Sequence, residues 1–157
     1  MRNLSKVILT AILFFALSLN VRAQISSLVV GVDGFTCSLC AKGVAEQFKA
    51  LDFVKSVKTD IKKTEFTLYI KPGQIADISI ISEAVSDGGF TLRDIKIDVK
   101  GSLKGDANSG YFLTAPNISE FSLKDVKGKF SDGDKVSLKG KIFSPVTTIN
   151  VTSIKKL

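Results

Sequence analysis

Hydrophobic and polar residues alternate along the chain with two distinct periods. In segments rich in β-branched residues, apolar side chains recur at every second position, which is the pattern of a strand. Other segments place apolar residues three or four positions apart, as at Val44, Phe48 and Leu51, which is the pattern of an amphipathic helix. Up to residue 99 these patterns predict strands at 25–32, 53–61, 65–70 and 90–99 and helices at 40–51 and 77–89.

The order βαββαβ is that of the ferredoxin-like fold, in which two helices cover one face of an antiparallel sheet. After residue 100 only short alternating segments follow, and they predict strands within 111–116, 120–130, 134–143 and 147–157. We therefore expect an α+β chain, with a ferredoxin-like domain at 24–99 and a small basic all-β domain at 100–157. The segment 101–110 is rich in Gly, Ser, Asn and Asp and predicts a turn or linker between the two domains.

The first 23 residues have the pattern of a secretory signal peptide. Arg2 and Lys6 form a basic start, an apolar run extends from Val7 to Leu19, and Ala23 ends a small-residue cleavage site. The apolar run is shorter than the roughly 20 residues that a membrane-spanning helix needs. We expect cleavage after residue 23 and a soluble mature chain that is secreted or periplasmic, with no transmembrane segment.

Without this segment the chain is poor in catalytic side chains. The sequence has no His and no Trp, and its single Met is residue 1. Since there is no imidazole, neither a Ser-His-Asp nor a Cys-His catalytic arrangement can form. A blue-copper site and a closed zinc site of four Cys and His ligands are excluded as well. We expect no catalytic residues and no enzymatic activity; the soft donors that remain are Cys37 and Cys40.

Cys37 and Cys40 form a C-x-x-C pair between the first predicted strand and the first predicted helix. This position places Cys37 in an exposed loop and Cys40 in or near the first helical turn. There the unpaired N–H groups and the helix dipole stabilise a thiolate over a thiol. Two thiolates favour soft ions such as Cu(I). An open two-sulfur site of this kind hands its ion on to an incoming thiol.

Three motifs within residues 25–99 resemble the heavy-metal-associated domain of copper chaperones, metal-transporting ATPases and periplasmic mercury-binding proteins. They are VDGFTCSLC at 32–40, DFVKSVKTD at 52–60 and SDGGF at 86–90. Phe35 stands where the family has Met, and Phe90 occupies the family's aromatic position. The resemblance implies that Cys37 and Cys40 are the metal ligands. Cu(I) is the expected ion, with Hg(II), Ag(I) and Zn(II) as alternatives.

Two alternatives to a metal carrier remain open. A C-x-x-C pair also serves thiol-disulfide chemistry, and in an oxidising compartment the two cysteines can form a disulfide. The chain can instead be a cell-envelope interaction protein in which the Cys pair is incidental. If the chain carries metal, its partners are metal donors or acceptors with exposed thiols.

The charge of the mature chain is concentrated after residue 99. Residues 24–99 hold nine Lys and Arg and ten Asp and Glu, whereas residues 100–157 hold ten Lys and five Asp and Glu. Such a basic region attracts an acidic partner or an anionic envelope surface.

The basic region also contains two kinds of motif. The segment 131–142, SDGDKVSLKGKI, resembles OB-fold barrels, which bind oligonucleotides or oligosaccharides. For an exported protein we do not expect nucleic acid as a partner. Asn117 and Asn150 begin N-x-S/T sequences, which we interpret as chance matches to the glycosylation motif.

Overall fold

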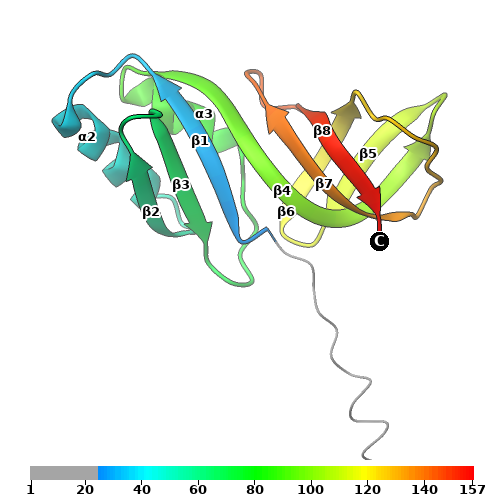
Figure 1. Ribbon diagram of the computed structural model, residues 1–157. Coiled ribbons are helices and arrows are strands. Elements are labelled where there is room, and N and C mark those ends of the chain that lie inside the picture. Colours follow the sequence, from blue (N-terminus) through cyan, green and yellow to red (C-terminus); the bar gives the residue numbers. More distant parts are fainter. Residues whose placement is uncertain (1–24) are drawn as a thin grey trace, which may run out of the picture.

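The computed structural model describes residues 25–157 (Figure 1). This part of the chain is mixed α+β, with two helices and eight strands that form one continuous sheet. The predicted signal peptide, residues 1–23, lies outside the described residues. Between residues 25 and 157 no helix has both the length and the apolar character needed to cross a bilayer.

The first half follows the predicted order of elements. These are β1 (Ser27–Asp33), α2 (Ser38–Lys49), β2 (Val54–Asp60), β3 (Glu65–Ile70), α3 (Ser79–Asp87) and β4 (Thr91–Asp106). The strands lie in the order β2, β3, β1, β4, and each is antiparallel to its neighbour. The two helices pack against each other and against the sheet (Figure 1).

Alternation along the strands decides which side chains form the core beneath the helices. Every second residue of β1 and β3 faces the helices, and the helices contribute the apolar stripe that the sequence predicts. The fully buried side chains of this half include Leu28, Val30, Val32, Phe66 and Leu68 from the strands and Val44, Phe48, Ile81 and Val85 from the helices. One two-layer core therefore supports both the sheet and the helix that follows β1.

Strand β4 is longer than the sequence predicts. The segment 101–110, which we expected to be a turn or linker, is strand as far as Asp106, and only 107–109 form a turn. The expectation is therefore wrong for 101–106 and correct for 107–109. At Gly101 the reason is close packing of β4 against β5, which leaves no space for a side chain. A Cβ at Gly101 would lie 2.5 Å from the carbonyl oxygen of Thr114 on the neighbouring strand. The predicted domain boundary near residue 100 thus falls inside a continuous strand.

The second half closes into a ring of strands. It adds β5 (Gly110–Ala115), β6 (Ile118–Lys124), β7 (Lys135–Ile142) and β8 (Thr148–Lys156) to the end of β4. The ring runs β4, β5, β6, β8, β7 and returns to β4; the β6–β8 pair is parallel and the others are antiparallel. Its interior is filled by buried apolar side chains, among them Leu103, Leu113, Phe121, Leu138 and Ile149.

The strand predicted at 120–130 ends early, at Lys124. Asp125 has a φ of 61° and Gly128 a φ of 120°, and these left-handed conformations interrupt strand pairing. Residues 125–134 form an irregular loop instead. The Tyr111 hydroxyl anchors this loop by donating a hydrogen bond of 3.2 Å to the carbonyl oxygen of Phe130.

The two halves share β4 as a common strand. It pairs with β1 over residues 91–97 and with β7 over residues 95–102. Ion pairs reinforce the second contact, because Lys141 on β7 lies 3.2 Å from Asp94 on β4, and Lys139 lies 3.1 Å from Asp98. The halves are therefore joined through a sheet and not through a linker.

Candidate thiol site

The two cysteines lie together at the N-terminus of α2. Cys37 is the N-cap residue, and Cys40 is in the first turn of the helix. Their sulfur atoms are joined in a disulfide, with the two Cα atoms 5.4 Å apart. Cys37 is exposed and Cys40 is half-buried. The exposure of Cys37 and the position of Cys40 in the first turn agree with the prediction from the sequence.

The sulfur of Cys37 also caps the helix. Its Sγ accepts a hydrogen bond of 3.0 Å from the backbone N–H of Cys40, one of the N–H groups that the first turn of a helix leaves without an internal partner. The first turn of α2 contains no acidic residue. The Cys37 sulfur therefore lies at the positive end of the helix dipole, with no carboxylate in the first turn.

An aromatic cluster packs against the loop that carries Cys37. The chain turns at Gly34, which has a φ of 102°, and the next side chain, Phe35, is buried. The Phe35 ring lies 5.8 Å from the ring of Phe66 on β3 and 5.8 Å, edge to face, from the ring of Phe90. Contacts of this geometry stabilise the fold beyond the contribution from burying the rings. The loop is therefore attached to the same core as the helix.

Leu39, between the two cysteines, is a site feature that the sequence analysis missed. Its side chain is 77 % exposed, and in the sequence it immediately precedes Cys40. The signal for it is the helical period, because Leu39 is outside the stripe formed by Val44 and Phe48.

A metal ion at this site would have two protein sulfur ligands. In the part of the chain from 25 to 157, no group of three or more Cys, Asp, Glu or His side chains is placed to hold a metal ion. Cys37 and Cys40 are also the only sulfur-containing residues of that part. Such a site leaves coordination positions open for a ligand from a partner.

The carboxyls whose pKa is shifted by their neighbours lie away from the cysteines. At the far end of α2, the hydrogen bond from Lys49 lowers the pKa of Glu46. In the second half, hydrogen bonds from Lys104 and Lys156 lower the pKa of Glu120 and Asp134 respectively. These pairs lie on the surface of the fold and are not part of the thiol site.

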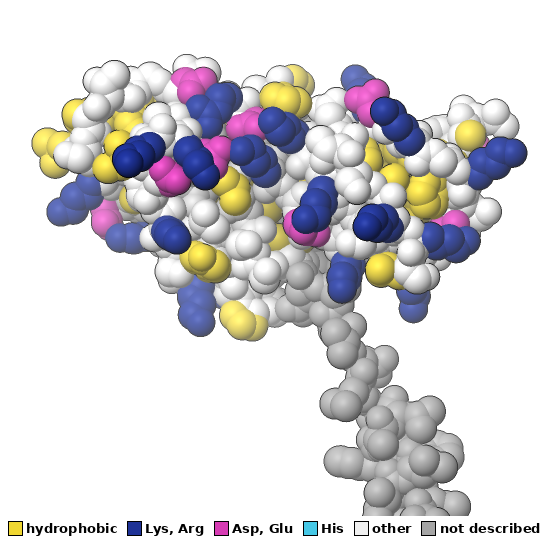
Figure 2. All heavy atoms as spheres, viewed as in Figure 1, with side chains coloured by type: hydrophobic (Ala, Val, Ile, Leu, Met, Phe, Trp, Pro, Cys, Tyr) yellow, Lys and Arg dark blue, Asp and Glu magenta, His cyan; other side chains and the backbone are white. Residues whose placement is uncertain are grey.

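The lysines of the basic region are only partly available to a partner. Figure 2 shows Lys and Arg side chains spread over both halves of the visible face, with Asp and Glu among them. Four lysines of 100–157 form ion pairs, namely Lys104 with Glu120, Lys139 with Asp98, Lys141 with Asp94 and Lys156 with Asp134. Part of the charge difference between the halves therefore stabilises their junction.

Comparison with known proteins adds no relative to this description. No protein-family model, no curated protein and no solved structure matches the chain. The resemblance to the heavy-metal-associated domain rests on the three sequence motifs and stays a prediction.

Proposed function

We propose that the chain is an exported carrier of a soft metal ion, Cu(I), which it binds through the thiolates of Cys37 and Cys40. The observation that carries this proposal is the convergence of the two sulfur atoms at an exposed helix N-terminus. The ion is cargo and passes from a donor protein to an acceptor protein. Hg(II), Ag(I) and Zn(II) are the alternative cargoes. Of these, Hg(II) and Ag(I) are the softer ions, which soft thiolate ligands favour.

The arrangement of the strands supports this proposal. Within the eight-stranded sheet, β2, β3, β1 and β4 are neighbours in that order and the first half contains two helices, which supports a ferredoxin-like arrangement. The thiol pair follows the first strand, as the resemblance to the heavy-metal-associated family implies. For 100–157, the closed ring with its parallel β6–β8 pair supports an OB-like barrel. A fold alone does not assign a function, so the proposal depends on the chemistry of the two thiols.

Metal binding requires the reduced pair. Reduction breaks the Cys37–Cys40 bond and takes up two electrons and two protons, which a partner dithiol supplies as it is oxidised to its own disulfide. Each thiol then releases its proton when it ligates the ion. Because two sulfurs leave positions open, a thiolate of the acceptor adds before a bond to Cys37 or Cys40 breaks.

The disulfide itself favours a second candidate, a thiol-disulfide exchange protein. In that function a substrate thiolate attacks the exposed Cys37 sulfur, a mixed disulfide forms, and Cys40 leaves as the thiolate. A second thiol of the substrate then completes its oxidation and releases Cys37. The two candidates need the same residues but different substrates, so they can be separated by experiment.

Anaerobic titration of the reduced mature chain with Cu(I), against a chromophoric competitor, tests the carrier. We expect one tightly bound ion per chain, or one per pair of chains if two sites share an ion. Cys37→Ser and Cys40→Ser should each abolish tight binding, whereas Ser38→Ala, in the same turn, should leave it unchanged. Tight binding that survives in the double serine variant would exclude this site.

A parallel assay distinguishes the other candidates. The oxidised chain is mixed with a reduced, unfolded dithiol protein, and the disulfides formed per minute are counted. Each chain can form one substrate disulfide as its own is reduced, so the rate of this single oxidation is compared. A carrier should oxidise the dithiol slowly and bind Cu(I) tightly when reduced; a redox protein should show the reverse. A chain that does neither would be an envelope interaction protein with an incidental Cys pair.

A further inference from the structure

Strand β8 has an open edge along most of its length. On one side it pairs with β7 from Ile149 to Lys156. On the other side it pairs with β6 only at residues 148–150, because β6 ends at Lys124. In the described part of the chain, β8 beyond Asn150 has no strand on that side. An edge of this kind presents backbone N–H and C=O groups that can pair with another chain.

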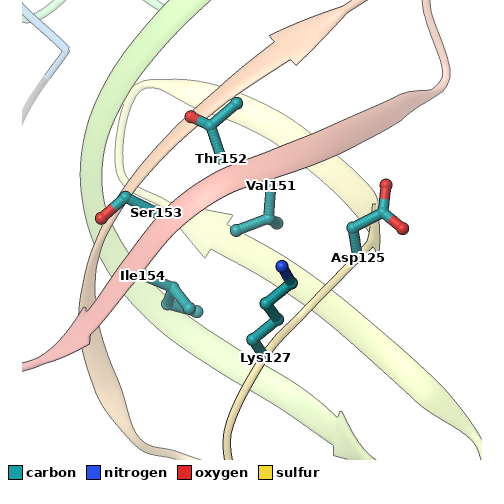
Figure 3. Close-up of a pocket in the computed structure, with 6 residues that line it drawn as sticks. All are labelled: Asp125, Lys127, Val151, Thr152, Ser153 and Ile154. Carbon is teal, nitrogen blue, oxygen red and sulfur yellow. The ribbon is translucent and has the colours of Figure 1, made fainter.

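A cleft lies along this open edge. It has a volume of about 530 Å³ and is bounded by residues 151–154 of β8 on one side and by Asp125 and Lys127 of the β6–β7 loop on the other. Figure 3 shows that the Lys127 side chain extends from the loop toward β8 and Val151. The volume is in the range of sites that hold ligands. The cleft exists because the chain leaves the sheet after Lys124.

Apolar side chains at the cleft are incompletely covered. Val151 and Ile154 pack against the barrel core, yet both are only half-buried. In a complete barrel a neighbouring strand would cover them, and here the loop does so only in part. A strand added beside β8 would remove this apolar surface from water and would also pair the open backbone groups.

The charge around the cleft selects the kind of strand. Lys127 has no ion pair in the described residues. The same is true of Lys124 at the end of β6, Lys129 on the loop and Lys155 near the end of β8. Asp125 is the one acidic residue that lines the cleft. Unpaired lysines attract acidic side chains and raise the rate of association with them.

We propose that this cleft is the docking site for an extended, acidic segment of a partner protein, which adds as a strand to the open edge of β8. About five or six residues can pair along 151–156, at about 3.3 Å per residue. Acidic side chains of the segment meet Lys127 and Lys155, and apolar side chains between them cover Val151 and Ile154. The site is separate from the cysteines and does not depend on metal binding.

Two other occupants fit less well. A second copy of the chain, paired edge to edge through β8, would bring the same unpaired lysines together, and like charges oppose such pairing. The segment 1–23 contains three basic residues and no Asp or Glu, so it lacks the complementary charge. The chain from Gln24, the start that the predicted cleavage would give, is therefore the form to test.

The test uses two labelled hexapeptides, Glu-Val-Glu-Val-Glu-Val and Lys-Val-Lys-Val-Lys-Val, and fluorescence anisotropy at low salt. We expect the acidic peptide to bind at least about tenfold more tightly than the basic one. Hydrogen exchange of the complex should show new protection at 151–156. Equal binding of the two peptides, or protection at another edge of the sheet, would overturn the proposal.

A matched pair of variants tests the role of the cleft. Lys127→Glu should weaken binding of the acidic peptide about tenfold, while Lys129→Glu, with the same change of charge outside the cleft lining, should weaken it less than about threefold. Both side chains are exposed, and a urea titration checks that both variants remain folded. Cys37→Ser should bind the peptide like the parent chain. Equal effects of the two lysine variants, or a dimer through β8 in sedimentation, would contradict an acidic partner at this site.

Discussion

The side chain of Asn117 is hydrogen-bonded to both backbone polar groups of Ile25. Its Oδ1 accepts the Ile25 N–H and its Nδ2 donates to the Ile25 carbonyl oxygen, each at 2.9 Å. Asn117 lies in the turn between β5 and β6, whereas Ile25 precedes β1. The backbone carbonyl of Asn117 also accepts the N–H of Ala76 at 2.8 Å. One buried residue of the second half thus pairs with two segments of the first.

Removal of this side chain should destabilise the whole chain. Asn117→Ala leaves the N–H and C=O of Ile25 buried without partners, and we expect a loss of about 2–4 kcal/mol in the free energy of unfolding. Urea titration measures the loss. Asn150→Ala is the control, because its half-buried side chain makes one hydrogen bond of 3.4 Å to Lys141; it should cost less than about 1 kcal/mol. Equal losses would mean that Asn117 does not join the halves.

The shared strand predicts that both halves unfold together. The chain has two tyrosines and no Trp, with Tyr69 on β3 and Tyr111 on β5. Tyr69→Phe and Tyr111→Phe therefore give chains whose fluorescence reports one half each. We expect urea midpoints by fluorescence and by circular dichroism to coincide within each variant. Two separate transitions would show that the predicted boundary near residue 100 separates independent folding units.

Two glycines should respond to substitution in opposite directions. Gly101→Ala places a Cβ against the Thr114 carbonyl oxygen and forces β4 and β5 apart, so we expect a loss of about 1–3 kcal/mol. Gly43 lies in α2, and a Cβ added there would meet no atom within 4 Å. Gly43→Ala should therefore stabilise the chain by about 1 kcal/mol. Thermal unfolding measures both. A neutral Gly101→Ala would mean that 101–106 tolerates a linker-like conformation.

Acid should weaken the end of β8. Asp134 is hydrogen-bonded to Lys156 and accepts the N–H of Ser131, and both contacts lower the pKa of its carboxyl, the first more than the second. Because the folded pKa is the lower one, this stabilisation is present above about pH 4, the pKa of an unfolded Asp. It is lost as the pH falls through the folded value.

Urea titrations at pH 7 and at pH 3 test whether acid removes this stabilisation. In Asp134→Asn the urea midpoint should fall less between the two pH values than in the parent chain. Asp125→Asn is the control, because the Asp125 carboxylate has no ion pair in the described residues. Its urea midpoint should fall as much as that of the parent chain. If the midpoint falls equally in all three chains, Asp134 does not contribute to the loss of stability in acid.

The unequal exposure of the two cysteines predicts unequal roles in the proposed carrier. Cys37 is exposed and Cys40 is half-buried, so an incoming thiol reaches the metal beside Cys37 first. Metal exchange with a competing dithiol should slow more in Cys37→Ser, whereas residual affinity should fall more in Cys40→Ser. Stopped-flow exchange and competition titration measure the two quantities. Equal effects of both variants would mean that both thiols bind the metal but that Cys37 is not the first point of exchange.

The sequence alone determined most of the first half and the position of the thiols. Period-two and helical patterns are local properties, so they predicted the βαββαβ order and placed Cys37 in the loop and Cys40 in the first turn of α2. They did not predict which sulfur receives the helix N–H. That hydrogen bond depends on the extended backbone of Cys37 as the N-cap residue.

Only the tertiary structure decided how the halves are joined. Gly101 and Gly105 belong to a segment whose composition is typical of a linker, yet both are strand residues. They pair with β7 and β5 respectively, and such pairing depends on neighbours that are distant in sequence. The same holds for Asn117, a polar residue whose burial follows from the unpaired backbone of Ile25, 92 residues away. It holds also for the cleft beside β8, since an open edge exists only where a partner strand ends. Local patterns specify elements, and long-range hydrogen bonds specify which elements meet.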